Sequence, residues 1–115
     1  MDRNNRFRAL FPGTGGLQHA DPAPLRHLSI GIEPLNQEVN RVVIRAEAPH
    51  PGYGIRVMGI YFSGGRALIY VEAVRPDPSV MHPQVISAVQ TVTYIDNTYT
   101  PLFPPEYEKY ISPWI

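Results

Sequence analysis

Apolar and polar residues alternate along much of the chain between residues 25 and 95, a pattern that predicts β-strands. A first strand is expected over residues 25–32, where Leu28, Ile30 and Ile32 alternate with other residues. A second is expected over residues 39–48. Its apolar face carries Val42, Ile44, Ala46 and Ala48, and its polar face carries Arg41, Arg45 and Glu47. Residues 35–41 are also compatible with a short helix, and that alternative stays open.

Residues 52–75 predict a β-hairpin around which the rest of the fold is organised. Gly64 and Gly65 suit a two-residue turn, because glycine adopts positive φ angles without a Cβ clash. In a regular register from this turn, the expected pairs include Ile60–Ile69, Gly59–Tyr70, Met58–Val71 and Val57–Glu72. Both faces of the ribbon are then mostly apolar, whereas a hairpin with one wet face alternates cleanly. We therefore expect something to cover the second face.

Residues 85–95 predict the last strand, after a proline-containing connection over residues 76–83. Ser87, Thr91 and Thr93 are expected to face solvent. The opposite face is expected to be dry and carries Ile86, Ala88, Val92 and Tyr94.

The C-terminal tail, residues 97–115, is rich in aromatic side chains. The sequence Pro104-Pro105-Glu106 is a suitable helix start, with proline early and an acidic residue in the first turn. A helix this short is not stable alone, so the tail must dock on something. Its expected docking residues are Tyr107, Tyr110 and Trp114. They could cover the second face of the hairpin in their own chain or dock on a partner subunit.

The 13 prolines fall mostly between the predicted strands, because proline disrupts helix interiors and central strands. The sequence therefore predicts one all-β domain over residues 25–115. We expect a small antiparallel β-sandwich or open barrel of about five to seven strands, with a short C-terminal helix or docked aromatic tail. Residues 1–24, which include the glycine-rich stretch 11–16, are expected to form a flexible N-terminal segment.

Ten basic and ten acidic side chains balance each other. A nucleic-acid partner is not expected, because phosphate binding needs a basic surplus, and Arg3, Arg6 and Arg8 are interpreted as a solvated cluster. No apolar run approaches the roughly 20 residues of a membrane helix, so membrane insertion is not expected. Without the apolar core of a signal peptide, a cytoplasmic location is expected if Met1 is the native start. Envelope association stays open if it is not.

No catalytic or metal-binding pattern emerges from the sequence, so we expect neither an enzyme nor a cofactor. The four histidines lack the spacing of a metal site. His50 and His82 both lie beside prolines in loops that could meet, but two exposed loop histidines are the favoured interpretation. Glu72 lies mid-strand among apolar neighbours, where a carboxylate pKa can rise, and Arg56 is its expected partner. The absence of cysteine excludes disulfides and thiolate chemistry.

From Val42 to Ile95 the order of features resembles the C-terminal domain of the PrcB family, proteins associated with bacterial protease complexes. The resemblance is carried by Pro51-Gly52-Tyr53 entering an apolar strand, a short glycine turn, and the strand 68–73. A proline-containing connection and a closing strand, 89–95, follow. His50-Pro51-Gly52-Tyr53 stands where that family has Thr-Gly-Gly-Tyr. The resemblance implies a non-catalytic accessory or binding domain of small β-sandwich type.

Three functions follow as hypotheses. The first is a protein-binding or accessory module of a bacterial protease or envelope complex. Its expected contacts lie in two proline-stiffened loops, at Pro49, His50, Pro51, Tyr53, Met81 and His82. The second is a structural homo-oligomer, such as a homodimer, assembled through the hairpin face and the aromatic tail. The third is a small-ligand binder with a polar pocket near Glu72 and Arg56.

Overall fold

The computed structural model describes residues 20–111. The predictions made for Arg3, Arg6 and Arg8, for the stretch 11–16 and for Trp114 lie outside the described residues. The elements are β1 (Arg26–Pro34), β2 (Val39–Ala48), β3 (Gly54–Ser63), β4 (Arg66–Val74), β5 (Ser87–Asp96), β6 (Thr100–Leu102) and a 3-10 helix, η2 (Pro105–Tyr110).

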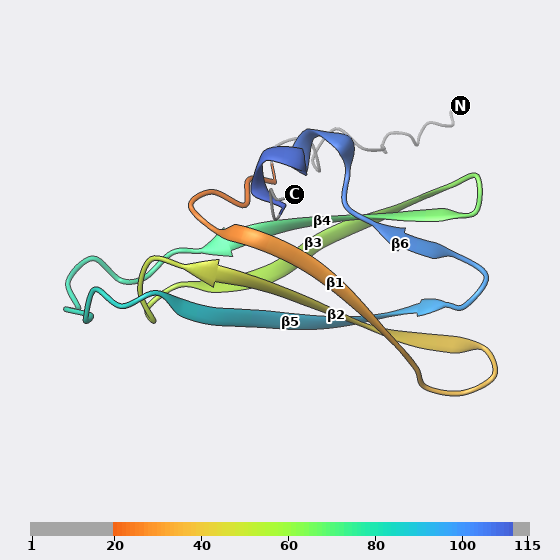
Figure 1. The fold of residues 1–115 in the computed structure, drawn as a ribbon, viewed down its shortest axis with the longest axis horizontal. Helices are drawn as coiled ribbons and strands as arrows, with labels where there is room; N and C mark the ends of the chain where they lie inside the picture. Colours follow the sequence, from red (N-terminus) through yellow and green to blue (C-terminus); the bar gives the residue numbers. More distant parts are fainter. Residues whose placement is uncertain (1–19, 112–115) are drawn as a thin grey trace, which may run out of the picture.

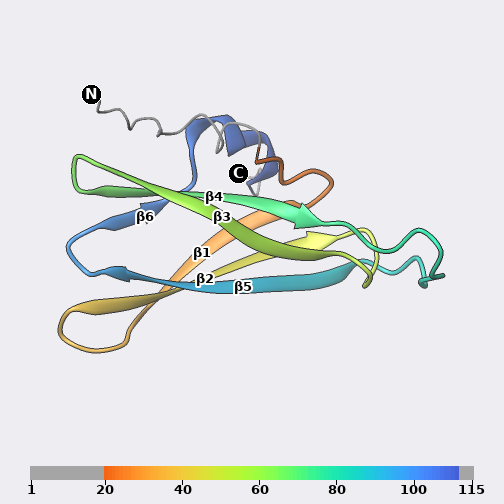
Figure 2. The same cartoon turned by 180° about the vertical axis from the view of Figure 1, so that it is seen from behind.

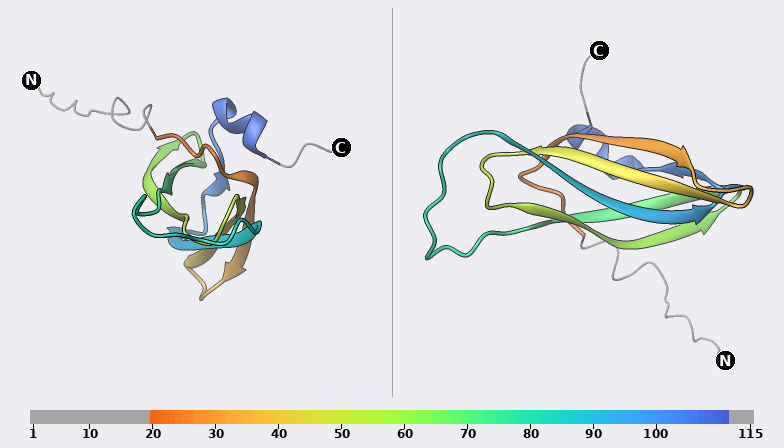
Figure 3. Two further views of the ribbon diagram at one scale, coloured as in Figure 1. Left: turned by 90° about the vertical axis from the view of Figure 1, so that its left-hand side faces the viewer. Right: turned by 90° about the horizontal axis from the view of Figure 1, so that it is seen from below.

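The strands form two three-stranded sheets that face each other, as Figures 1 and 2 show. The first has the order β1-β2-β5 and is antiparallel throughout. The second has the order β3-β4-β6, in which β6 runs parallel to β4. The end-on view in Figure 3 places η2 outside the strands. The prediction of a small all-β sandwich with a short C-terminal helix is confirmed.

The core lies between the sheets and takes one face of each strand. Val42, Ile44, Ala46 and Ala48 are buried on β2, and Arg45 and Glu47 are exposed on its other face. The helical alternative for residues 35–41 is wrong. The Asn36 side chain accepts hydrogen bonds from the backbone N–H groups of Glu38 (2.7 Å) and Val39 (2.8 Å), which fixes a turn between β1 and β2.

The central hairpin has the predicted turn, with φ of 58° at Gly64 and 78° at Gly65. Five pairs follow the predicted register, from Ser63–Arg66 to Gly59–Tyr70. Beyond Gly59 the predicted pairs Met58–Val71 and Val57–Glu72 are wrong, because Met58 is an extra residue that forms a β-bulge. The observed pairs are Val57–Val71, Arg56–Glu72, Ile55–Ala73 and Gly54–Val74. The bulge turns Val57 and Ile55 to the same face as buried Val71.

The two faces of β5 are the reverse of the prediction. Thr93 lies opposite Val42, and Thr91 lies opposite Ile44. Directly paired residues project from the same face of a sheet, and Val42 and Ile44 are fully buried, so both threonines face the core. The expected dry face is the outer one, where Tyr94 is 55% exposed, and Ile86, just before the strand, is 71% exposed.

The C-terminal segment completes an edge of β4 that β6 leaves open. β6 pairs only with residues 66–68 of β4. Further along β4, the Val71 N–H donates to the Tyr107 hydroxyl oxygen at 3.2 Å. The same hydroxyl lies 3.0 Å from the Val71 carbonyl oxygen and 3.2 Å from the Ala20 carbonyl oxygen. The Ala73 N–H donates to the Asp21 carbonyl (3.3 Å). Residues 20–24, which the sequence analysis assigned to a flexible segment, therefore pack along the edge of β4.

Tyr107 docks on its own chain. Its ring meets Tyr70 edge-on, with ring centres 6.0 Å apart, and only 2% of the residue is exposed. Tyr70 belongs to the face of β4 opposite buried Ile69 and Val71, so η2 covers part of the second face of the hairpin. Burial raises the pKa of Tyr107 to about 12 and raises the pKa of Tyr70 as well.

Candidate functional site

Two long connections meet at one end of the sandwich, on the left of Figure 1. They are the β2–β3 connection, residues 49–53, and the β4–β5 connection, residues 75–86. We call these two segments together the loop surface. All six residues that the sequence analysis proposed for partner binding belong to it.

The two connections are joined by stacked imidazole rings. His50 and His82 lie with ring centres 5.1 Å apart and ring planes 14° apart, and Tyr53 packs against His50 with centres 4.9 Å apart. The structure therefore brings together three of the predicted residues. The favoured interpretation of His50 and His82 as two exposed loop histidines is wrong, since both are half-buried against each other.

Gly52 makes room for this stack. Its N–H donates to His50 Nδ1 at 3.1 Å, which orients the first ring and requires that nitrogen to carry no proton. A Cβ atom at Gly52 would lie 2.6 Å from His82 Nε2, far inside van der Waals contact. A residue without a side chain is thus required where the second ring approaches.

The β4–β5 connection is stiffened internally. The Asp77 carboxylate accepts hydrogen bonds from the Ser79 N–H (2.9 Å) and the Ser79 hydroxyl (2.8 Å). These bonds, with a smaller contribution from the nearby His82, lower the pKa of Asp77. The turn is therefore held with Asp77 ionised.

The loop surface also presents apolar side chains to solvent. Met81 is 96% exposed, and a shallow hollow of about 270 Å³ separates it from His50 and Pro76. Further exposed apolar residues of the same connection are Val80, Val85 and Ile86. The sequence analysis did not propose these three, because it assigned Val85 and Ile86 to the last strand. Val80 lies beside Met81 between Pro78 and Pro83, and this apolar pair was the signal that could have found it. Pro49 and Pro51 are exposed on the other connection.

The geometry of the loop surface suits contact and hydrogen bonding. Among residues 20–111 no group of three or more histidine, aspartate or glutamate side chains is placed to hold a metal ion. The Gly52 N–H already occupies His50 Nδ1, and the two imidazole rings lie face to face. Glu72, the carboxylate singled out from the sequence, lies opposite Arg56 and forms an ion pair with it, in which Arg56 Nε donates to Glu72 Oε2 at 2.7 Å.

Gly52→Ala is expected to separate the two connections while leaving the sandwich folded. The added methyl group displaces the His82 ring, and the free energy of unfolding falls by only about 1 kcal/mol, because the core is untouched. The Gly54→Ala variant is the matched control, since a Cβ there meets Val74 at an ordinary 3.5 Å. Proton NMR of the imidazole rings is the measurement. The ring shifts of both histidines should move in the first variant only, and unmoved shifts would contradict the stack.

Comparisons with family models, with curated proteins and with solved structures find no match to this chain. In the part of the chain that the structure describes, no helix has the length and apolar character needed to cross a membrane.

Proposed function

We propose that this chain is a non-catalytic protein-binding domain that contacts its partner through the loop surface. The observation that carries the proposal is the stack of His50 on His82. It joins two connections, residues 49–53 and 75–86, that lie on either side of the central hairpin in the chain. The resemblance to the PrcB C-terminal domain supports the role of an accessory subunit in a bacterial protease or envelope complex.

The exposed apolar side chains of the loop surface support protein binding. Apolar residues scattered singly over a surface are ordinary, whereas a group of them marks an interaction site. Met81 and Ile86 are 96% and 71% exposed within one connection. Prolines and the Asp77 turn already restrict this connection, so binding loses little conformational entropy. A preorganised apolar surface of this kind favours a protein partner.

The two alternative functions have less support. The homo-oligomer hypothesis needs the aromatic tail to be free for a second subunit, but Tyr107 is already buried against Tyr70 in its own chain. The hypothesis of a ligand pocket near Glu72 needs a free carboxylate, and that carboxylate is paired with Arg56 on an outer face.

Met81→Asp is expected to weaken partner capture about tenfold. The substitution places a charge in an apolar contact, which typically costs about 1–2 kcal/mol of binding free energy, and a loss of that size lowers the affinity by roughly a factor of ten. The immobilised chain is incubated with extract of the cells that express it, and the proteins retained are quantified. Leu35→Asp is the matched control, since Leu35 is 56% exposed in the turn at the opposite end of the sandwich. Equal losses in both variants, or none in either, would contradict the proposal.

A further inference from the structure

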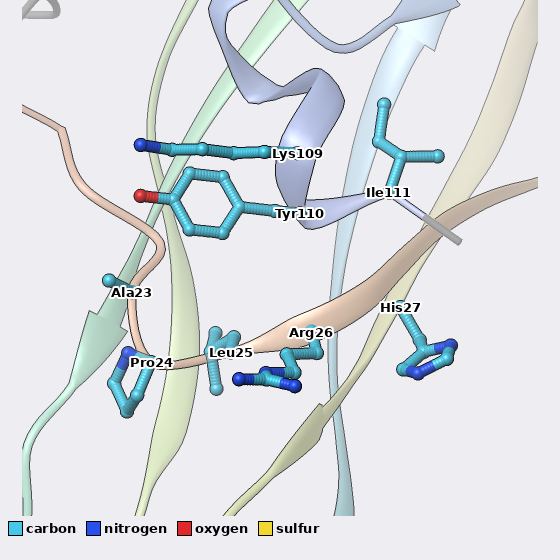
Figure 4. Close-up of a pocket in the computed structure, with 8 residues that line it drawn as sticks. All are labelled: Ala23, Pro24, Leu25, Arg26, His27, Lys109, Tyr110 and Ile111. Atoms are coloured by element: carbon cyan, nitrogen blue, oxygen red, sulfur yellow. The ribbon is translucent and has the colours of Figure 1, made fainter. Parts of the chain in front are cut away.

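A second hollow, of about 440 Å³, opens between η2 and the start of β1. Figure 4 shows Lys109 and Tyr110 side by side on the η2 wall, and residues 23–27 on the other. The walls come from opposite ends of the chain. They are joined by the backbone bridge between Leu28 and Ile111 and by the Tyr110 hydroxyl, which donates to Asp21 Oδ1 at 3.2 Å. The volume lies within the range of roughly 300–1,000 Å³ that is usual for small-molecule sites.

A β-bulge shapes the β1 wall. Arg26 lies opposite Glu47, and Ser29 lies opposite Arg45, so β1 has one extra residue over this stretch. His27 takes up the irregularity with a φ of 57°, a left-handed conformation that a non-glycine residue seldom adopts. As a result Arg26 and His27 are both exposed, between buried Leu25 and Leu28. A regular strand would turn one of the two basic residues inward.

The hollow is positively charged although the chain as a whole is balanced. Arg26 and Lys109 line it from opposite walls, and none of the described residues that line it is acidic. Among the described residues neither cation belongs to an ion pair. The other basic residue, His27, turns away from Tyr110 in Figure 4 and lies 3.9 Å from Glu47. The nearby Asp21 carboxylate is already bonded by the Tyr110 hydroxyl and the Ala23 N–H.

Apolar surface lies beside these two charges. Pro24 and Ile111, both half-buried, line the hollow, and the ring of Tyr110 has Lys109 Nζ at 5.2 Å from its centre. Two cations that have no ion-pair partner among residues 20–111, next to an aromatic ring and aliphatic side chains, match the general make-up of a site for a small organic ion. Arginine and lysine both bind carboxylate and phosphate groups.

We propose that this hollow binds a small organic anion. Arg26 and Lys109 hold its carboxylate or phosphate group, and Tyr110, Pro24 and Ile111 contact its carbon skeleton. The site is independent of the partner-binding proposal, although Arg26 also lines a neighbouring hollow that reaches Pro49 and Ile86. Lys109 lines this hollow and a neighbouring one at Asp21 and Glu106, and both lie away from the loop surface, so Lys109 is the sharper position to test.

The test is an NMR titration of the isotopically labelled full chain with benzoate, with inorganic phosphate, and with benzamide as the uncharged counterpart of benzoate. We expect saturable shifts of the amide signals of residues 23–27 and 109–111 with at least one of the anions and none with benzamide. The anion that binds more tightly identifies the head group. The absence of saturable shifts with both anions, or equal shifts with benzamide, would overturn the proposal.

The Lys109→Gln variant should bind the preferred anion about tenfold more weakly, since it loses one charge-assisted contact. Lys109 is exposed, and the dispersion of the amide signals reports that the variant is folded. Arg66→Gln is the matched control, because Arg66 is an exposed cation beside the hairpin turn. This variant should bind the anion with the same affinity as the unmodified chain. Unchanged binding in Lys109→Gln would overturn the proposal, and it would leave the Met81 experiment unaffected.

Discussion

Tyr107→Ala is expected to lower the free energy of unfolding by about 4 kcal/mol, a large share of the stability of a domain this size. The ring is buried, with the rings of Tyr70, Phe103 and Tyr110 at centre distances of 6.0, 6.2 and 6.1 Å. The substitution removes this packing and leaves the Val71 N–H without its acceptor. Unfolding in urea, followed by far-UV circular dichroism, measures the change.

Two further variants separate the ring from the hydroxyl. Tyr107→Phe keeps the ring and should cost about 2 kcal/mol, because a buried donor loses its partner. Tyr110→Phe removes a hydroxyl that, within residues 20–111, is bonded only to the exposed Asp21 carboxylate, and should change stability by about 0.5 kcal/mol or less. If Tyr107→Ala were as mild as Tyr110→Phe, η2 would not complete the edge of β4.

The second large effect is a loss of stability in alkali. Burial raises the pKa of Tyr107 to about 12, whereas an exposed tyrosine ionises near pH 10 or so. A folded-state pKa above the unfolded-state value means that the folded chain retains the phenolic proton more strongly. This stabilisation is fully present below about pH 10 and is lost as the pH rises towards 12. The loss attributable to Tyr107 is about 2 kcal/mol.

Urea unfolding between neutral pH and pH 12 measures this dependence, with Tyr107→Phe as the reference. The pKa of Tyr70 is also raised by burial, so the unmodified chain loses stability in this range through more than one group. The difference between the two chains isolates Tyr107, and it should shrink as the pH approaches 12. Two parallel stability curves would contradict the buried hydroxyl.

The hairpin was predictable only as far as local chemistry controls it. Gly64 and Gly65 specify the turn, and the turn specifies the register as far as Gly59. The sequence analysis paired Gly59 with Tyr70 and continued in a regular register, although glycine inside a strand is also a sign of a bulge. Pattern alone does not place the extra residue, Met58, because both neighbouring positions are apolar. The direct pairing of Arg56 with Glu72 follows from that bulge.

The predicted inward face of β5 was wrong for a different reason. Its alternate positions carry apolar residues on both faces, with Val89 and Ile95 on one and Val92 and Tyr94 on the other. Alternation therefore cannot choose between the faces, and pairing with β2 decides the matter. β6 was missed because three residues that include Pro101 give no periodic signal, and their parallel pairing with β4 is a tertiary contact.

The candidate site was predictable in its location rather than in its geometry. The prolines around residues 49–51 and 76–83 indicate two rigid connections, and the structure places both at one end of the sandwich. The contact between His50 and His82 depends on the space left by Gly52, which no spacing rule expresses. Arg26 was missed as a site residue because a bulge, rather than the strand pattern, turns it outward.

The proposed function requires that the loop surface be one preorganised unit. Nuclear Overhauser effects between the ring protons of His50 and His82, recorded near neutral pH on the chain alone, test that claim directly. Rings with centres 5.1 Å apart should give clear cross-peaks, and Gly52→Ala should abolish them. The absence of these cross-peaks in the unmodified chain, together with backbone NMR relaxation in both connections as fast as that of a free chain end, would contradict the proposed binding surface.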